Sequence, residues 1–485
     1  MLTFQKSRRP KWAVAGRIAC CLALTTGALL AQVGPPILVR LNAVVTDSSG
    51  QPISDMKADD FKITDQNRPG QIVFLRHIDG TNWPVPVPAG EFSNRPGGVP
   101  PHTVAILLDL MNQSQSDRLD AARTLGKSLQ QLEAGDSVYL YLLTLEGKIE
   151  PIHPLGGQAG DDHTWTQQID KTLDKAVKNA SHARPAGMGQ EDVVKKTYVA
   201  LEALGNQLAT RPGRRDIIWV TGGVPNVYPT NSTCSGDWVD CALYVPHLAV
   251  TLDKAGTAVN PLSYSSNLNP AGTRDMEDAA GLTGGKAFFR EDIRSVLAQF
   301  EKDAVNYYTI AYDPSAENWD NKFHKVHLTS DRKGIKLQSR TRYYALPDQR
   351  PPAGRAQSAL VTAYQNPVDT PDVGLRMVMS SAGERKGLRL GIHVNLADLV
   401  LREQSGAYEG AVILLISDVG AAGPLGDPTV STFNLHLTKE QYAAALKDGV
   451  PLAADHPLKD GTQKLRIIVL DLTTNLTGSL TAPVH

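Results

Sequence analysis

The sequence has little that points to nucleic acid, acidic membranes or a disordered chain. Its 485 residues include 49 Lys plus Arg and 50 Asp plus Glu, which leaves a formal net charge of −1. A balance this even predicts no long-range attraction to nucleic acid or acidic lipid. Only four residues are cysteines, and 41% are hydrophobic, a fraction that excludes wholesale disorder. A chain of this length predicts two or three domains.

The motifs of common catalytic sites are also missing. The histidines show no HExxH or other metal-ligand spacing, and no GxSxG nucleophile elbow occurs. Residues 121–128 (AARTLGKS) fit a relaxed phosphate-loop pattern, but they fall inside a predicted amphipathic helix. A working phosphate loop leaves a strand and opens a helix, so that its amides face the phosphates. We expect no enzyme activity; a hydrolase with an unrecognised site is the least favoured alternative.

Residues 1–31 have the layout of a secretory signal peptide. Basic residues precede an apolar run at 18–30, and cleavage is predicted after Ala31. The run of about 13 residues is shorter than the ~20 that span a bilayer, so a retained anchor is the less favoured alternative. Leu29 at the −3 position leaves the cleavage site open. We expect an exported protein, periplasmic or extracellular (cell surface), with no membrane span after cleavage.

Cys234 and Cys241 are the only cysteines after the predicted signal peptide. Two cysteines separated by six residues in an exported chain predict one disulfide that closes a small loop. A zinc site there would need two further ligands, and only His247 is close in the sequence. We therefore favour the disulfide.

The central residues 102–306 alternate between strand and helix patterns. Apolar runs such as 104–108 and 216–221 predict strands that are buried on both faces. The alternation predicts an α/β fold with a doubly wound, mostly parallel sheet of the Rossmann type. Further strands are predicted at 138–143 and 258–263, and helices at 119–132, 165–177, 192–208, 246–254, 276–282 and 293–305.

The segments on either side are rich in strand patterns. Residues 36–80 predict a small N-terminal β unit, which is too short for its own core and should pack on its neighbour. Residues 81–101, rich in Pro and Gly, predict a stiff connector. Residues 307–345 predict an antiparallel β extension, 346–364 a linker and 365–485 a C-terminal β-sandwich.

Two of the buried central strands end in polar residues, Asp109 and Thr221. Ligands of open α/β sheets bind beyond the carboxyl ends of the strands. These features resemble the von Willebrand factor A (VWA) domain, which carries Asp-x-Ser-x-Ser after its first strand. In that family a Thr and an Asp from two further loops complete a metal ion-dependent adhesion site for Mg²⁺. Asp109 matches the first aspartate, but Met111 and Gln113 replace the serines and Gly222 replaces the third-loop Asp.

The resemblance leaves three candidate metal ligands, Asp109, Asn112 and Ser114. The last two are one residue out of step and can substitute only if the loop is remodelled. The second loop, 185–190, lacks the expected Thr, and Thr197 falls too far into the predicted helix. We expect Mg²⁺ to bind weakly or not at all. The alternative that we favour is that Asp109 hydrogen-bonds the amides of its own loop.

A narrower resemblance covers residues 36–345 and is carried by short blocks. They are similar to the VWFA-related domain of acidobacterial type, which implies the fold and export but names no activity. The blocks lie at 44–53 (VVTDSSGQPI), 58–63 (ADDFKI), 218–225 (IWVTGGVP), 306–308, 323–325 and 340–344, and the end of the chain at 465–471 resembles the region that often follows them.

Three aromatic residues, Tyr228, Trp238 and Tyr244, surround the predicted disulfide loop. They follow the strand that ends at Thr221, near the face where VWA domains bind partners, and Tyr and Trp are frequent interface anchors. We take them as candidates for partner binding; the alternative is that they pack the loop.

The function favoured by these observations is an exported, non-catalytic protein-binding or adhesion module with a degenerate metal ion-dependent adhesion site. Its partner would be another protein, which the sequence does not identify. The alternative is a structural or assembly component of the cell envelope. In that case the VWA-like domain would serve as a scaffold, and the flanking β domains would make the contacts.

Overall fold

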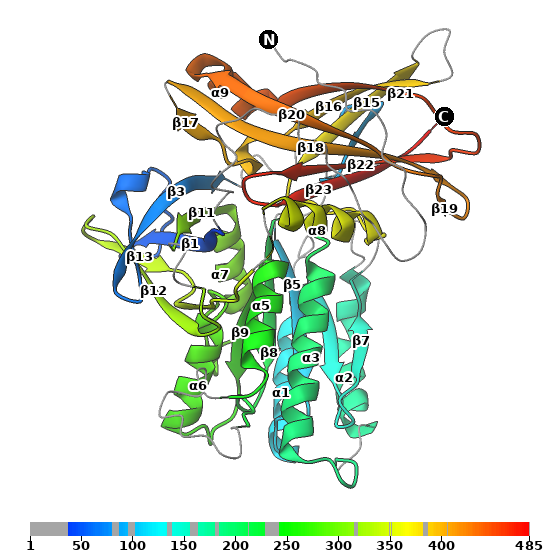
Figure 1. Cartoon of the computed structure of the whole chain (residues 1–485). Helices are drawn as coiled ribbons and strands as arrows, with labels where there is room; N and C mark the ends of the chain where they lie inside the picture. The colour runs from blue at the N-terminus through cyan, green and yellow to red at the C-terminus, as the bar shows by residue number, and fades with distance from the viewer. Residues whose placement is uncertain are drawn as a thin grey trace. The chain divides into compact units, whose positions relative to one another are not determined.

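The computed structural model divides the chain into two compact units, whose helices and strands are labelled in Figure 1. The large unit contains Leu38–Pro84 and Gly98–Asp348, and the C-terminal unit contains Val85–Gly97 and Gln349–His485. The structure describes residues 37–79, 87–95, 102–132, 138–155, 163–179, 184–211, 213–227, 242–314, 319–348, 350, 352–381, 387–404 and 406–484. The predicted signal peptide lies outside the described residues.

A six-stranded sheet forms the centre of the large unit, in the order β10-β9-β8-β5-β6-β7. All neighbours are parallel except β6 and β7, which are antiparallel. The mostly parallel sheet of the predicted α/β fold is therefore present, with an antiparallel edge strand that the sequence pattern did not reveal. The strands are β5 (His102–Asp109), β6 (Val138–Leu143), β7 (Ile149–His153), β8 (Arg214–Val220), β9 (Thr257–Ser263) and β10 (Phe288–Phe289).

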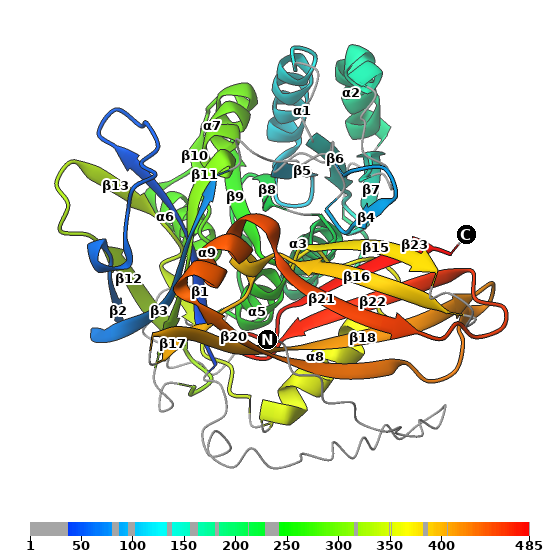
Figure 2. The ribbon, with the colours of Figure 1, turned by 90° about the horizontal axis from the view of Figure 1, so that it is seen from above.

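Helices cover both faces of this sheet, as Figure 2 shows. Helices α1, α2 and α7 bury Ile106 and Leu108 of β5 on one face, and α3, α5 and α6 bury Ala105 and Leu107 on the other. Successive side chains of a strand point to opposite faces, so an apolar run is what a sheet covered on both sides requires. Residues 121–128 lie inside α1 and form no phosphate loop. The helices are α1 (Gln115–Leu129), α2 (Ile169–Asn179, after the 3-10 turn His163–Gln168), α3 (Gln190–Leu208), α5 (Val245–Ala255), α6 (Pro270–Gly281) and α7 (Ile293–Val305).

A second sheet of the large unit is built from strands near the start and near the end of that unit's sequence. Its order is β13-β1-β11-β3-β2-β12-β14, and all of its neighbours are antiparallel. Strands from the two segments 36–80 and 307–345 are interleaved in it, and Leu41, Tyr308 and Tyr312 fill one shared core. Neither segment therefore needs a core of its own. The strands are β1 (Val39–Asp47), β2 (Lys62–Asp65), β3 (Arg68–Asp79), β11 (Asn306–Asp313), β12 (Phe323–Thr329), β13 (Ile335–Gln338) and β14 (Arg342–Tyr344), with a 3-10 turn at Ala58–Asp60.

The C-terminal unit is a sandwich of two antiparallel sheets. One has the order β21-β16-β15-β4; the other has the order β17-β18-β22-β23, with β19 and β20 also paired to β18. Ile392 from the first sheet and Leu414 and Ile467 from the second share one core. The elements are β4 (Glu91–Ser93), β15 (Leu375–Ser381), β16 (Leu388–Val394), a 3-10 turn (Leu396–Asp398), β17 (Arg402–Gln404), β18 (Ala407–Gly420), β19 (Gly423–Pro424), β20 (Thr429–Thr438), α9 (Lys439–Asp448), β21 (Val450–His456), β22 (Lys464–Asp471) and β23 (Thr477–Pro483).

Two parts of this unit come from segments that the sequence patterns assigned to connections. Strand β4 lies within residues 81–101 and pairs with β15. Helix α8 (Pro352–Gln365) occupies most of residues 346–364 and packs Ala356 and Ala363 against β18 and β22. A three-residue strand and an alanine-rich helix give weak local signals, because their stability depends on partners distant in the sequence. Among the described residues, no helix is long and apolar enough to cross a membrane.

Candidate functional site

Asp109 and Thr221 lie at the carboxyl ends of the neighbouring strands β5 and β8. The chain runs from β5 to β6 on one side and from β8 to β9 on the other. This is the switch point at which doubly wound sheets bind ligands. Both side chains are buried, Asp109 at 0% exposure and Thr221 at 2%. The structure brings together the two strand ends that the sequence singled out, but it places them beneath the surface.

Five hydrogen-bond donors surround the Asp109 carboxylate. Oδ1 accepts from the backbone amides of Met111 at 2.9 Å and Asn112 at 3.1 Å. Oδ2 accepts from Asn112 Nδ2 at 2.6 Å, from Trp219 Nε1 at 2.9 Å and from Thr221 Oγ1 at 3.2 Å. Asp109 therefore does bond the amides of its own loop, and both of its oxygens are occupied by protein donors.

The donors around Asp109 are all neutral groups. They offset only part of the rise in the carboxyl pKa that burial causes. Burial raises the pKa of the Asp109 carboxyl, while hydrogen bonds from Asn112, Trp219 and Thr221 act in the opposite direction. The environment therefore stabilises the charged carboxylate less well than water does.

Asn112 connects this cluster to helix α3. Its Nδ2 donates to Asp109 and also to Thr197 Oγ1, at 2.9 Å, and the Thr197 hydroxyl donates in turn to Val193 O at 2.8 Å. The prediction that Thr197 lies too far into its helix to approach the site is wrong. Val193 and Thr197 share the buried face of α3, and that face reaches the ends of the strands. The sequence pattern dismissed Thr197 and did not indicate Trp219, because only the packing of α3 and β8 brings Thr197 to Asn112 and Trp219 to Asp109.

The third loop has no room for the carboxylate that the VWA signature carries there. A Cβ atom added to Gly222 would lie 2.6 Å from Asn112 O and 3.3 Å from Gln113 Cα. The Gln113 side chain is buried and donates from Nε2 to Val220 O at 2.9 Å. The loop after β5 is thus folded down onto the loop after β8.

Ser114 has a local role instead of joining Asp109. It is exposed and caps helix α1, since its Oγ accepts from Asp117 N at 3.2 Å and donates to Asp117 Oδ2 at 2.8 Å. Of the three candidate ligands, the structure brings Asp109 and Asn112 into contact, and it records no hydrogen bond from Ser114 to either of these described residues. The spacing of Ser114 and Asp117, a hydroxyl three residues before a carboxylate, is a helix-capping signal that could have been read from the sequence.

These residues do not fit a resident Mg²⁺ ion. Mg²⁺ requires an octahedral set of oxygen ligands, whereas Asp109 is the single carboxylate of the cluster and Asn112 turns its amide nitrogen inward. The guanidiniums of Arg118 and Arg184 donate to carbonyls of the same loop and add positive charge nearby. In the part of the chain that the structure describes, no three His, Cys, Asp or Glu side chains are grouped to hold a metal. Protein N–H and O–H groups occupy both oxygens of the carboxylate that a cation would need.

Tyr244 is the one described member of the predicted aromatic anchors. It precedes α5 with a left-handed backbone (φ 70°), packs partly against the core, and donates its hydroxyl to Glu191 Oε1 at 2.6 Å. The hydrogen bond to Glu191 raises the pKa of this phenol. Tyr244 is thus tied to α3. The other two anchors, Tyr228 and Trp238, and the cysteines Cys234 and Cys241 lie outside the described residues.

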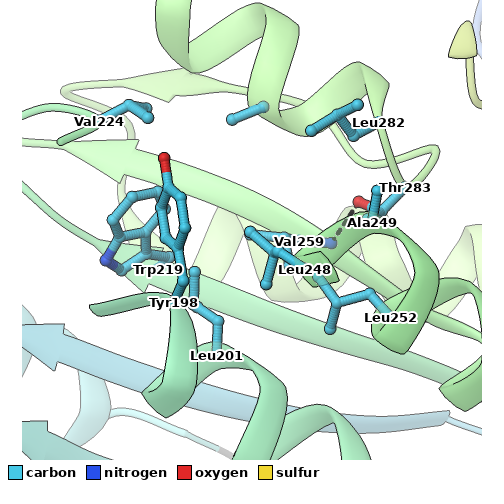
Figure 3. Close-up of a pocket in the computed structure, with 11 residues that line it drawn as sticks. Tyr198, Leu201, Trp219, Val224, Leu248, Ala249, Leu252, Val259, Leu282 and Thr283 are labelled. Atoms are coloured by element: carbon cyan, nitrogen blue, oxygen red, sulfur yellow. Dashed lines mark hydrogen bonds between the residues drawn. The ribbon is translucent and has the colours of Figure 1, made fainter. Parts of the chain in front are cut away.

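A small apolar cavity lies beside the cluster, between the sheet and helices α3, α5 and α6. Figure 3 shows Tyr198 next to Trp219 in the wall of this cavity. Leu248 and Leu252 of α5 also line it. Its volume is about 10 Å³, which is the space of at most one water molecule. The cavity is therefore no ligand site, and its wall fixes the indole whose N–H bonds Asp109.

No family model matches the chain, and no curated protein matches it. Among solved structures, human COPII-coat protein Sec24c is similar over 56% of this chain and 48% of its own, with 12% identity and a TM-score of 0.27. A mutant of the PilB minor pilin from Streptococcus sanguinis is similar over 42% of this chain and 62% of its own, at 14% identity and a TM-score of 0.26. Proximal thread matrix protein 1 from the mussel byssus, which has also been solved with a zinc-occupied MIDAS motif, covers 42% and 46%, with 12% identity and a TM-score of 0.23.

The chain spans less than two thirds of the length of each of these three structures. At TM-scores below 0.5 the likenesses identify neither a family nor a function.

Proposed function

We propose that this chain is an exported, non-catalytic protein-binding or adhesion module. In this proposal its α/β domain is of the VWA type, and its adhesion site works without a metal. One observation carries the proposal. The aspartate at the first metal position, Asp109, is surrounded by five protein donors at the switch point of the sheet.

The VWA assignment is supported by the strand order and by the place of the cluster within it. The first strand of the sheet ends at Asp109, and the adjacent strand leads into Thr221 and Gly222. These are the positions at which the VWA signature places its first and third loops. Helices on both faces agree with the same architecture.

A non-catalytic role is supported by the burial of the reactive groups. Asp109 and Thr221 are 3.2 Å apart, but their side chains are 0% and 2% exposed. A substrate would have to displace the loop after β5 before it reached either of them. Binding would therefore use the exposed rim of this edge, which includes Ser114 and Ser116. The segment with Trp238 is a further candidate that the sequence alone indicates.

The test is capture of partners from an envelope extract by the mature chain, once with Mg²⁺ and once with EDTA, followed by mass spectrometry. We expect the same protein in both conditions, and we expect Trp238→Ala to reduce its recovery. Val378→Ser, which changes an exposed residue of the C-terminal unit, is the control and should leave recovery unchanged. Capture that disappears with EDTA would contradict the metal-independent site.

A structural or assembly role in the cell envelope, with the VWA-like domain as scaffold, is the second candidate. It is favoured by the same burial, because Asp109 makes its hydrogen bonds within the domain and does not face a partner. Recovery of the partner that is unchanged in both Asp109→Asn and Trp238→Ala would favour this role over the first.

A further inference from the structure

Two arginines reach the loop after β5 from opposite faces of the parallel sheet. Arg118 lies in the first turn of α1, and Arg184 lies in the segment before α3; these two helices cover opposite faces of the sheet. Arg118 Nε donates to Leu110 O at 2.6 Å, and Arg184 Nη2 donates to Met111 O at 2.8 Å. The carbonyls of two consecutive residues therefore hold two guanidiniums at one loop.

The two guanidiniums are close enough to repel each other. Burial lowers the pKa of the Arg118 guanidinium, the charge of Arg184 lowers it further, and the charge of Asp109 acts in the opposite direction. Neither arginine forms an ion pair with a carboxylate of the described residues. Asp109 is the one described carboxylate whose charge acts on Arg118. Two guanidiniums thus share one carboxylate, and that carboxylate is buried.

The described carboxylates that flank the two arginines in the sequence are engaged by other groups. They are Asp109, which has five neutral donors, Asp117, which accepts from Ser114 and Ser265, Asp120, which pairs with Arg123, Glu191, which accepts from Tyr244, and Asp192, which accepts from Gly189 N. The fold therefore leaves the positive charge of this pair without a counterion.

The donors that remain on the two side chains are accessible. A guanidinium has five N–H donors, and each of these arginines donates through a single nitrogen to a described residue. Arg184 is exposed, and Arg118 is half-buried. The two Nη atoms of Arg118 have no partner and are not buried. An anion reaches both side chains without displacing the loop after β5.

We propose that Arg118 and Arg184 together bind the carboxylate of an acidic side chain on the partner protein. The inference rests on the proposed function and names the kind of group that this edge of the sheet recognises. Guanidinium donors match the oxygens of a carboxylate in charge and geometry. A carboxylate held by both arginines also offsets the repulsion between them. The positive charge that binds the partner then comes from arginine and not from a metal.

The test is binding of a fluorescein-labelled, capped hexaglutamate peptide to the mature chain at low ionic strength, measured by fluorescence anisotropy, with hexaglutamine as the uncharged control peptide. We expect Arg184→Gln to weaken binding about tenfold or more, the loss expected for one charge-assisted hydrogen bond. Arg123→Gln removes the same charge from an exposed arginine of α1 and should leave binding unchanged. Arg118→Gln should also weaken it. Because Arg184 is exposed, Arg184→Gln keeps the test decisive if Arg118→Gln fails to fold.

No binding of hexaglutamate, or equal binding by Arg184→Gln and Arg123→Gln, would overturn the proposal. Displacement of the peptide by inorganic phosphate at a lower concentration than by acetate, at constant ionic strength, would overturn the choice of a carboxylate. The inference and the proposed function fail separately. Capture of the partner from the extract that is unchanged in Arg184→Gln contradicts this site and leaves the proposed function standing. Peptide binding that Arg184→Gln weakens, with no partner captured, supports this site and contradicts the proposed function.

Discussion

Asp109 and Asp216 lie on adjacent strands of the same sheet, and both are 0% exposed, yet their surroundings are opposite. Asp109 receives only neutral donors, and burial raises the pKa of its carboxyl. Burial acts in the same direction on Asp216, but the charge of Arg214 and the hydrogen bond from His102 outweigh it and lower the pKa of that carboxyl.

Burial alone does not decide whether a carboxylate keeps its charge, because a nearby cation can reverse the effect. Asp109 is held by shape and hydrogen bonds, and Asp216 is held by charge.

The largest effect is expected for Asp216→Asn. The substitution preserves shape but removes the carboxylate that Arg214 Nε and His102 Nε2 each contact at 2.9 Å, and with it the charge that Arg214 pairs with. Removal of one partner from a buried ion pair costs about 3–5 kcal/mol, to be measured as the loss of unfolding free energy in urea. Asp455→Asn breaks an exposed pair with Arg389 and should cost less than about 1 kcal/mol. Equal losses of unfolding free energy in the two variants would contradict the claim that the buried charge of Asp216 stabilises the fold.

Asp109→Asn should cost less, about 2 kcal/mol. No cation loses its partner there, but the new amide group points an N–H at neighbours such as Trp219 Nε1 and Thr221 Oγ1. The measurement is the same urea titration. A loss as large as that of Asp216→Asn would show that the comparison between the two aspartates is wrong.

The two adjacent glycines of the third loop offer a matched test of how tightly the cluster is closed. Gly222→Ala should destabilise by about 1–2 kcal/mol through overpacking, because its Cβ would meet Asn112 O at 2.6 Å. Gly223→Ala has nothing within 4 Å of its added Cβ, so its Tm should stay close to the wild-type value. Equal Tm values for the two variants would show that the loop after β5 does not pack tightly against Gly222.

The smallest effect is expected in the pH dependence of stability, at most about 1.4 kcal/mol per pH unit for each proton. The folded pKa of Asp216 lies below the usual 3.8, so its contribution is present above pH 3.8 and is lost as the pH falls further. The folded pKa of Asp109 lies above 3.8, so its contribution is complete below pH 3.8 and is lost as the pH rises through the folded value.

Urea unfolding at a series of pH values checks both signs. Asp216→Asn should flatten the loss of stability in acid, and Asp109→Asn should flatten the loss of stability just above pH 3.8. Opposite changes in slope would mean that the two pKa shifts have been assigned the wrong direction.

Much of the secondary structure was predictable because it depends on local patterns. Helix α7 (Ile293–Val305), strand β6 (Val138–Leu143) and strand β16 (Leu388–Val394) have bounds that agree with their hydrophobic periodicity or apolar runs. Asp109 was predictable as a site residue because it is the polar end of an apolar run. The short strands β7 and β10 were not, since neither has a periodicity of its own.

The candidate site was predictable only in part. Met111, Gln113 and Gly222 stand where the VWA signature has two serines and an acid, and from this resemblance the sequence predicts a degenerate metal site. Trp219, which donates to Asp109, and Thr197, which accepts from Asn112, were not indicated as site residues. Their contacts join residues 85 and 110 positions apart in the sequence.

The sequence by itself determined most of the longer strands and helices, because backbone geometry ties each element to a spacing of apolar side chains. It also determined that Asp109 ends a buried strand. Only the tertiary structure decided what surrounds that carboxylate and which arginines meet at the loop after it. Arg118 and Arg184 come from separate segments of the chain, yet both donate to carbonyls of that loop. Such contacts follow from the packing of whole layers, which no local pattern encodes.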